Sequence, residues 1–234
     1  MLTDTQLQQI MPRLAAAKLP LYLPHLNRAM QAYGVDTMPR TAAFVAQLAH
    51  ESGEFRWMEE IWGPTDPQRR YEPPGTLAAR LGNTQPGDGK RFKGRGPIQI
   101  TGRFNYAKYG ALLGVDLVAQ PDLAATPAIA FATAGLYWKS NGLNELADAN
   151  DFLKITRRIN GGTNGLADRQ KYHARALQVL ATGFVAGAAL RGAAARAAKV
   201  PTEPLLRGFE SIRRIRVTAP AAKKPAAKAT RRGR

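Results

Sequence analysis

Two glutamates nine positions apart, Glu51 and Glu60, are the residues whose type and spacing most directly suggest chemistry. Upstream, Phe44, Leu48 and Glu51 fall at i, i+4 and i+7, so a helix here would aim Glu51 at its buried face. A carboxyl group in apolar surroundings keeps its proton to higher pH and can deliver it to a leaving group. The alternative is a helix-end carboxylate turned to solvent.

The place of the second carboxylate depends on where this helix ends. In an unbroken helix, Glu51 and Glu60 would lie about 13.5 Å apart along the axis and about 180° apart around it, too far apart to face one substrate. Gly53 is a suitable helix stop that lets the chain bring Glu60 back across a cleft. A pair about 6.5 to 9.5 Å apart leaves room for a water molecule and predicts inverting glycoside hydrolysis. Glu54 is a rival at about 5 to 6 Å, nearer to the spacing of a retaining pair, and Glu59 is a weaker one.

Several elements would have to position these groups. Asp36 or Thr37, just before Pro39, would open the helix that carries Glu51. Alternating apolar residues predict a short strand or hairpin over 91–101, and helices are expected over 107–114 and 127–140. The last of these is apolar on most faces and therefore belongs in the core.

The segment 63–93 is rich in proline, glycine and polar residues and is expected to be a long loop. A loop of this length inside a compact domain is usually functional. Trp62 and Tyr71 are candidates for stacking on sugar faces, although they could equally fill core space.

Three separated blocks of sequence resemble glycoside hydrolase family 19, the group that holds plant-type chitinases and phage endolysins. The blocks are His50-Glu51-Ser52-Gly53 with Phe55 and Glu60; Gly94-Arg95-Gly96-Pro97-Ile98-Gln99-Ile100-Thr101 with Asn105-Tyr106; and Ile159-Asn160-Gly161-Gly162 with Asp168-Arg169 and Tyr172. The resemblance covers roughly residues 40 to 180. It implies a mainly α, lysozyme-like bilobal helical domain with a small β-hairpin, in which Glu51 is the general acid and Glu60 the general base.

The same resemblance implies roles for residues of the later blocks. Thr101 would position the attacking water, and Gln99 and Asn105 would hydrogen-bond N-acetyl groups or sugar hydroxyls, with Tyr106 beside them in the substrate site. Asn160 would be a further substrate ligand. Arg169 would be the cation that organises the carboxylates and stabilises the ionised base that it approaches.

This sequence departs from the family pattern at four places. Glu54 stands where phage members usually have glycine, and the run 61–64 replaces an Asn-Leu-Asn-Tyr-like segment. Phe104 replaces a tyrosine, and Asn164 stands where plant chitinases carry an acid. The base assignment and the charge network around Arg169 are therefore the parts of the resemblance most open to change.

Composition limits the other possibilities. There is no cysteine, and Glu54 occupies the position where a zinc protease helix needs its second histidine, so neither a metal nor another cofactor is expected. Neither a secretory leader nor an 18-residue apolar run is present, so synthesis in a host cytoplasm is expected, with action at the cell wall after help in crossing the membrane.

The net charge of +17 is concentrated at the carboxyl end. Residues 183–234 hold 13 basic and 2 acidic residues, a charge of +11, and the first 182 residues hold the remaining +6. We therefore predict a catalytic domain over 1–182 and a basic tail over 183–234, with an amphipathic helix at 205–217 and disorder beyond Thr218. The expected partners are peptidoglycan and, through the tail, lipopolysaccharide or anionic lipid; neither a specific nucleic acid nor a second copy of the chain is expected.

The leading functional hypothesis is an endolysin that hydrolyses β-1,4 bonds between the N-acetylated sugars of bacterial peptidoglycan by an inverting mechanism. One alternative keeps the chemistry and changes the substrate to chitin. Another is a basic envelope- or nucleic-acid-binding protein on an inactive hydrolase scaffold, which the tail alone would satisfy.

Overall fold

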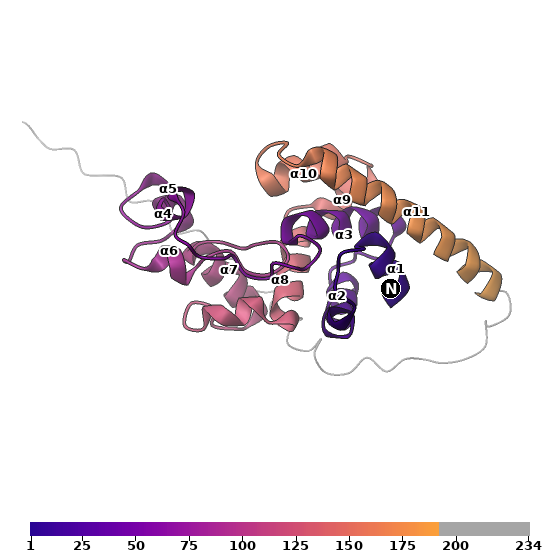
Figure 1. Ribbon diagram of the computed structural model, residues 1–234, viewed down its shortest axis with the longest axis horizontal. Coiled ribbons are helices and arrows are strands. Elements are labelled where there is room, and N and C mark those ends of the chain that lie inside the picture. The colour runs from indigo at the N-terminus through magenta and orange to yellow at the C-terminus, as the bar shows by residue number, and fades with distance from the viewer. Residues whose placement is uncertain (192–234) are drawn as a thin grey trace, which may run out of the picture. The chain divides into compact units, whose positions relative to one another are not determined.

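The described part of the chain is mainly helical, as expected. The computed structural model describes residues 1–191, with side chains as far as Thr182, and all of them belong to one compact unit (Figure 1). The helices, in chain order, are α1 (Asp4–Ile10), α2 (Leu19–Ala32), α3 (Met38–Ser52), α4 (Asp66–Arg69), α5 (Thr76–Leu81), α6 (Asp88–Arg91), α7 (Arg103–Leu113), α8 (Pro127–Ser140), α9 (Leu143–Asp148), α10 (Phe152–Asn160) and α11 (Leu166–Arg191), with 3-10 turns at Ala16–Lys18 and Pro121–Ala125.

The helices form two groups. Figure 1 shows α4, α5 and α6 gathered at one end of the unit and α3, α10 and α11 at the other, with α7 and α8 between them. The predicted hairpin is present in minimal form, since β structure in the described residues consists of isolated antiparallel bridges that pair Arg95 with Glu59 and with Ile100.

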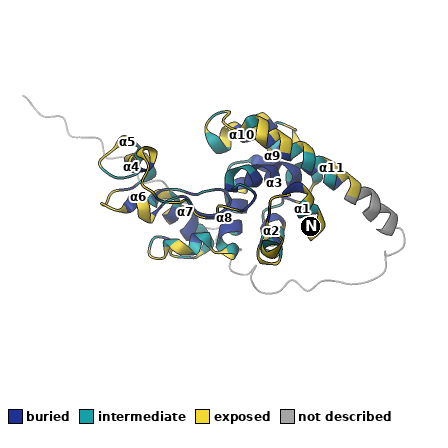
Figure 2. Cartoon of the chain, viewed as in Figure 1, coloured by how far each residue is buried: buried dark blue, intermediate teal, exposed yellow. Residues whose placement is uncertain are grey.

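Helix α3 forms the centre of the core. Thr37 caps its first turn by accepting a hydrogen bond from the Arg40 N–H, and the helix ends at Gly53, which adopts a left-handed conformation with φ 58°. Both boundaries confirm the expectation. Helix α11 packs along α3, α8 packs against α2, and buried residues concentrate in α3 and α8 (Figure 2). Phe44 and Trp138 join α3 to α8 edge-to-face, with ring centroids 5.1 Å apart.

The expectation of an irregular loop over 63–93 is wrong, because α4, α5 and α6 lie within it. The buried carboxylate of Asp88 organises the carboxyl end of this segment. Burial alone would raise the pKa of Asp88, but hydrogen bonds from Arg103 and from the Gln85 and Thr84 N–H groups hold that pKa below its ordinary value. These hydrogen bonds satisfy the Thr84 and Gln85 N–H groups just before α6 and hold this end of the segment in place.

The predicted division at residue 182 falls inside α11, which continues to Arg191. The expected amphipathic helix at 205–217 and the expected disorder beyond Thr218 lie outside the described residues. Over the range 1–191, no helix combines the length and apolar character needed to cross a bilayer.

Candidate active site

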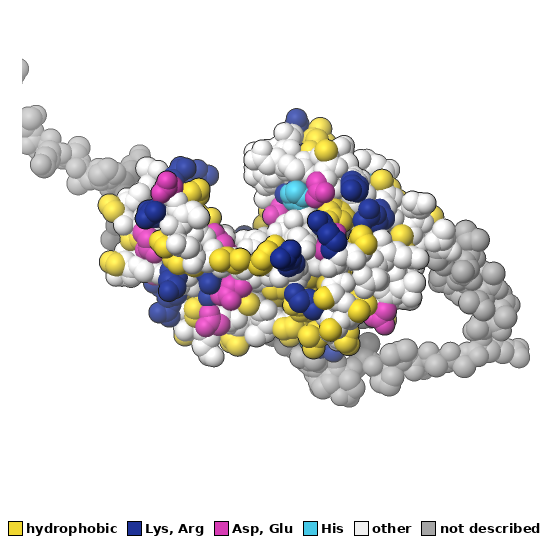
Figure 3. All heavy atoms as spheres, in the orientation of Figure 1, with side chains coloured by type: hydrophobic (Ala, Val, Ile, Leu, Met, Phe, Trp, Pro, Cys, Tyr) yellow, Lys and Arg dark blue, Asp and Glu magenta, His cyan; other side chains and the backbone are white. Residues whose placement is uncertain are grey.

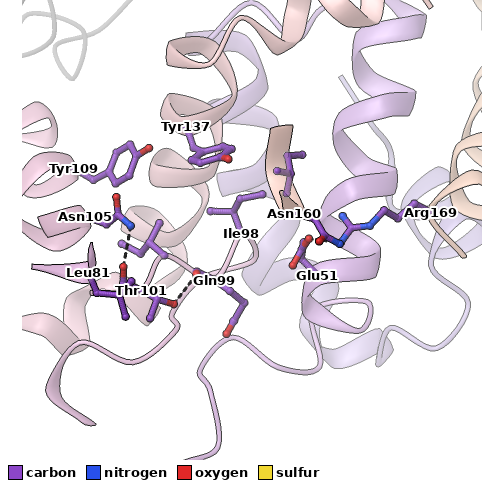
Figure 4. A pocket seen from close by; sticks show the side chains of 12 residues that line it. Glu51, Leu81, Ile98, Gln99, Thr101, Asn105, Tyr109, Tyr137, Asn160 and Arg169 are labelled. Atoms are coloured by element: carbon purple, nitrogen blue, oxygen red, sulfur yellow. Dashed lines mark hydrogen bonds and ion pairs between the residues drawn. The ribbon is translucent and has the colours of Figure 1, made fainter. Parts of the chain in front are cut away.

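A pocket of about 440 Å³ lies between the two groups of helices. Figure 3 shows the surface indented between the groups, and Figure 4 shows the side chains that line the pocket. The lining residues are Glu51, Leu81, Ile98, Gln99, Ile100, Thr101, Asn105, Tyr109, Tyr137, Ile159, Asn160 and Arg169. Six of the predicted site residues thus line it, although they come from separate parts of the chain: Glu51, Gln99, Thr101, Asn105, Asn160 and Arg169.

One side of the pocket, which we call the acid wall, is formed by Glu51, Asn160 and Arg169 at the ends of α3, α10 and α11 (Figure 4). Arg169 donates from Nη2 to Glu51 Oε1 at 2.5 Å. The Arg169 side chain is 2% exposed and that of Glu51 20%. The expectation of apolar surroundings for Glu51 is therefore wrong, because α11 packs on α3 and brings a buried guanidinium against the carboxylate. This cation approaches the predicted acid, whereas the resemblance implied that it would stabilise the base.

The opposite side, which we call the hairpin wall, is formed by Gln99, Thr101 and Asn105 (Figure 4). Gln99 has a φ of 53°, and its side-chain amide donates to the carbonyls of Gly96 at 2.8 Å and Trp57 at 3.2 Å. Thr101 Oγ1 donates to the Gln99 carbonyl at 3.0 Å, and Asn105 Nδ2 donates to the Thr101 carbonyl at 2.8 Å. These bonds hold the polar side chains in fixed orientations along the wall.

Glu60 lies beside the backbone of the hairpin, near Gln99. Its carboxylate accepts hydrogen bonds from the Gly94 N–H and from Gln68 Nε2, each at 2.9 Å. A Cβ atom at Gly94 would come within 2.5 Å of Gln99 Oε1 and 3.4 Å of Glu60 Oε2. Glycine at this position thus lets the Gln99 amide and the Glu60 carboxylate lie close together. Glu60 itself is not among the residues that line the pocket.

The two rival carboxylates are engaged elsewhere. The helix ends before Glu54, whose buried carboxylate accepts hydrogen bonds from the Tyr172 hydroxyl at 2.6 Å and from Arg13 Nε at 2.9 Å. Glu59 forms ion pairs with Lys93 at 3.1 Å and with Arg95 at 3.0 Å. Neither lines the pocket.

Three predicted substrate residues lie away from the pocket. Tyr106 is fully buried, donates its hydroxyl to the Lys93 carbonyl at 2.6 Å and accepts from Arg95 at 2.9 Å. Burial raises the pKa of Tyr106 to about 12. The expectation that it contacts substrate is wrong, because this face of α7 packs into the core. Trp62 and Tyr71 pack near each other, with centroids 6.3 Å apart, outside the pocket lining.

Sequence reasoning missed two tyrosines of the pocket. Tyr109 and Tyr137 line it from α7 and α8, with ring centroids 6.3 Å apart. Burial, together with the negative charges of Tyr109 and Glu51, raises the pKa of Tyr137 to about 12. Tyr109 follows Tyr106 by three positions on one helix, which was an available indication, but Tyr137 lies in a helix assigned wholly to the core.

Comparisons with known proteins identify the family of the chain. The sequence model of glycoside hydrolase family 19, described as Chitinase class I, matches residues 30–162. The chain belongs to glycoside hydrolase family 19. Its place there makes it a hydrolase of glycosidic bonds.

Relatives of this family 19 hydrolase include bacterial and plant proteins. A glycosyl hydrolase family 19 domain-containing protein of Haemophilus influenzae is 40% identical over 161 residues, which cover 59% of this chain and 78% of the relative. An endochitinase of Arabidopsis thaliana is 43% identical over 122 residues, 52% of this chain but 39% of the endochitinase. Among solved structures, chitinase C from Streptomyces griseus superposes with a TM-score of 0.61 and 26% identity, covering 76% of each chain.

Proposed function

We propose that this family 19 hydrolase is an endolysin that cleaves the β-1,4 bond between N-acetylated sugars of bacterial peptidoglycan and inverts the anomeric centre. The observation that supports this proposal is the pocket itself, with Glu51 on the acid wall, Gln99 and Thr101 on the hairpin wall, and Glu60 beside the hairpin backbone near Gln99. Two carboxyl groups on opposite sides of a sugar are what single displacement requires.

In the proposed reaction, Glu51 gives its proton to the glycosidic oxygen while the bond from that oxygen to C1 breaks. A water molecule attacks C1 from the opposite face, oriented by the Thr101 hydroxyl, and Glu60 takes the proton that the water releases. Arg169 then stabilises the carboxylate that Glu51 has become, across the 2.5 Å contact. Asn105 and Asn160 supply amide groups that suit the N-acetyl and hydroxyl groups of the sugars.

Chitin is the second candidate substrate, favoured by the relatives that are named endochitinases. Both polymers present β-1,4-linked N-acetylated sugars, so the carboxylate chemistry does not separate them. The charge of +11 over residues 183–234 favours the anionic envelope of a bacterium over neutral chitin.

The deciding experiment digests purified peptidoglycan and chitin oligomers in parallel. Products are identified by mass spectrometry, and the first-formed anomer is read by proton NMR. We expect muropeptides with inverted reducing ends and much slower turnover of chitin oligomers. Cleavage of chitin oligomers but not of peptidoglycan would show that chitin is the substrate. Products that retain the anomeric configuration would overturn the proposed inverting mechanism.

The envelope-binding proposal is tested by truncation after Arg191, which keeps α11 whole. The truncated protein should match the full chain within about twofold on exposed peptidoglycan, and only the full chain should bind vesicles of anionic lipid, less tightly as salt rises. Loss of glycan turnover with retained vesicle binding would favour the alternative of a binding protein on a hydrolase scaffold.

A further inference from the structure

A chain of buried polar side chains stands behind the acid wall. Gln47 and Thr156 are fully buried and Arg169 is 1% exposed. Gln47 donates from Nε2 to Thr156 Oγ1 at 2.9 Å and accepts from Arg169 Nη1 through Oε1. Arg169 in turn donates to Glu51, so the chain Thr156, Gln47, Arg169, Glu51 joins α10, α3 and α11.

The position of Gln47 on α3 explains how it reaches the same guanidinium as Glu51. The two residues are at i and i+4 on one helix, so their side chains lie on one face, one turn apart. A buried amide in the otherwise apolar run Phe44–Ala49 is costly unless both of its ends are paired, and here both are.

The bond to Thr156 fixes which end of the amide meets Arg169. With its NH₂ group committed to the Thr156 hydroxyl, Gln47 presents its oxygen to the guanidinium. The third contact of Arg169 is also neutral, a 3.4 Å hydrogen bond from Nε to the Asn164 carbonyl. Glu51 is therefore the carboxylate with which this buried cation pairs.

We propose that Gln47 is a positioning residue for the reaction, whose neutral amide oxygen holds the Arg169 guanidinium against Glu51 without competing for its charge. The inference rests on the proposed role of Glu51 as the acid. An amide supplies orientation only, whereas a carboxylate at the same place would draw the cation from Glu51 and add a like charge one turn away.

Other charged groups nearby are already paired or neutral. His50 and Asp168, next to Glu51 and Arg169 in sequence, bond to each other at 2.7 Å. Tyr137 faces Glu51 from α8 and is neutral at working pH, because burial raises its pKa to about 12. Helix α10 presents the uncharged Asn160 to the pocket, and Asp148 of α9 pairs with Arg40 near the start of α3. Arg169 is thus the cation that contacts the Glu51 carboxylate.

The test is a titration of the Glu51 side-chain carboxyl carbon by NMR in the full chain, with Glu51→Gln used to assign the signal. Gln47→Glu should raise the Glu51 midpoint by about one pH unit or more, because the ionised form loses part of its counter-ion. In a plot of activity against pH, the decline on the alkaline side should shift to higher pH by a similar amount. An unchanged midpoint in folded Gln47→Glu would overturn the proposal.

A second variant serves if Gln47→Glu does not fold. Thr156→Val removes the anchor of the amide and should lower kcat by about fivefold with little change in KM, and should raise the Glu51 midpoint measurably. Thr133→Val is the matched control, because Thr133 is 2% exposed and its hydroxyl has no hydrogen-bond partner within the described part of the chain. If the two valine variants behave alike, Gln47 has no positioning role.

Failure of this inference and failure of the proposed function give different results. The titration measures how Gln47 affects the Glu51 carboxyl group through Arg169, and its result does not depend on which glycan is cleaved. Full activity in Glu51→Gln would remove the proposed acid, whereas an inactive Glu51→Gln with an unshifted Gln47→Glu midpoint would remove only the role of Gln47.

Discussion

Glu51 is held by a side chain 118 positions further along the chain, whereas Glu60 is held by the backbone N–H of a glycine 34 positions away and by Gln68, eight positions away. The acid wall depends on how α11 docks on α3. The hairpin wall depends on a tight turn in which Gly94 lets the Gln99 amide approach. A change in helix packing should therefore disturb Glu51, the proposed acid, and a change in the turn should disturb Glu60, the proposed base.

Glu51→Gln should have the largest effect. It keeps the size of the side chain and removes the proton, so turnover of peptidoglycan should fall by about 10³- to 10⁴-fold. Turnover is measured on purified peptidoglycan, with circular dichroism to show that the variant is folded. Activity within tenfold of wild type would exclude Glu51 as the acid and leave the acid wall without a chemical role.

Glu60→Gln should follow, with a loss of about 10²- to 10³-fold, because the attacking water keeps its position but loses its base. Glu59→Gln is the matched control and should stay within about twofold, since Glu59 is committed to Lys93 and Arg95. If Glu59→Gln lost more turnover than Glu60→Gln, Glu59 would be the better candidate for the general base.

Gly94→Ala should lower kcat/KM by about tenfold. The added Cβ would meet Gln99 Oε1 at 2.5 Å, so the amide must move out of the wall. Gly75→Ala is a suitable control, because its Cβ would have no neighbour closer than 3.7 Å. Equal kinetics for the two alanine variants would show that the orientation of Gln99 does not matter for turnover.

Tyr172→Phe should have the smallest effect on activity, and its main effect should be a loss of stability. It removes the hydroxyl that donates to the buried Glu54 carboxylate at 2.6 Å, which should lower the free energy of unfolding by about 1 to 2 kcal/mol while turnover stays within about twofold. Tyr22→Phe, whose hydroxyl has no hydrogen bond to the described residues, should change stability by less than about 0.5 kcal/mol. Urea unfolding measures both. A large loss of turnover in Tyr172→Phe would bring Glu54 back as a candidate base.

Local features of the fold were predictable because they depend on neighbouring residues. Thr37 and Gly53 bound α3 as expected, since a threonine cap and a left-handed glycine act within one turn. The helix over Pro127–Ser140 also has the expected bounds, and it begins at a proline, which suits the first turn of a helix. The helices within 63–93 were missed because the proline- and glycine-rich sequence does not reveal contacts such as the ion pair between Asp88 of α6 and Arg103 of α7.

The sequence predicted which residues lie at the candidate site better than it predicted the contacts between them. Gln99, Thr101, Asn105 and Asn160 line the pocket, and the roles that the resemblance implied for them stay predictions. Tyr106 does not, because the side of α7 on which it lies was not fixed by sequence.

The sequence by itself determined the helical class, the ends of α3 and the family to which the chain belongs, because caps, glycines and short motifs act over a few residues. Tertiary structure decided that Arg169 pairs with Glu51, that Glu54 is buried against Arg13 and Tyr172, and that Gln47 stands behind the acid wall. Those contacts join residues between 41 and 122 positions apart. Only the packing of α11 on α3 and of the first residues against the end of α3 brings such side chains together.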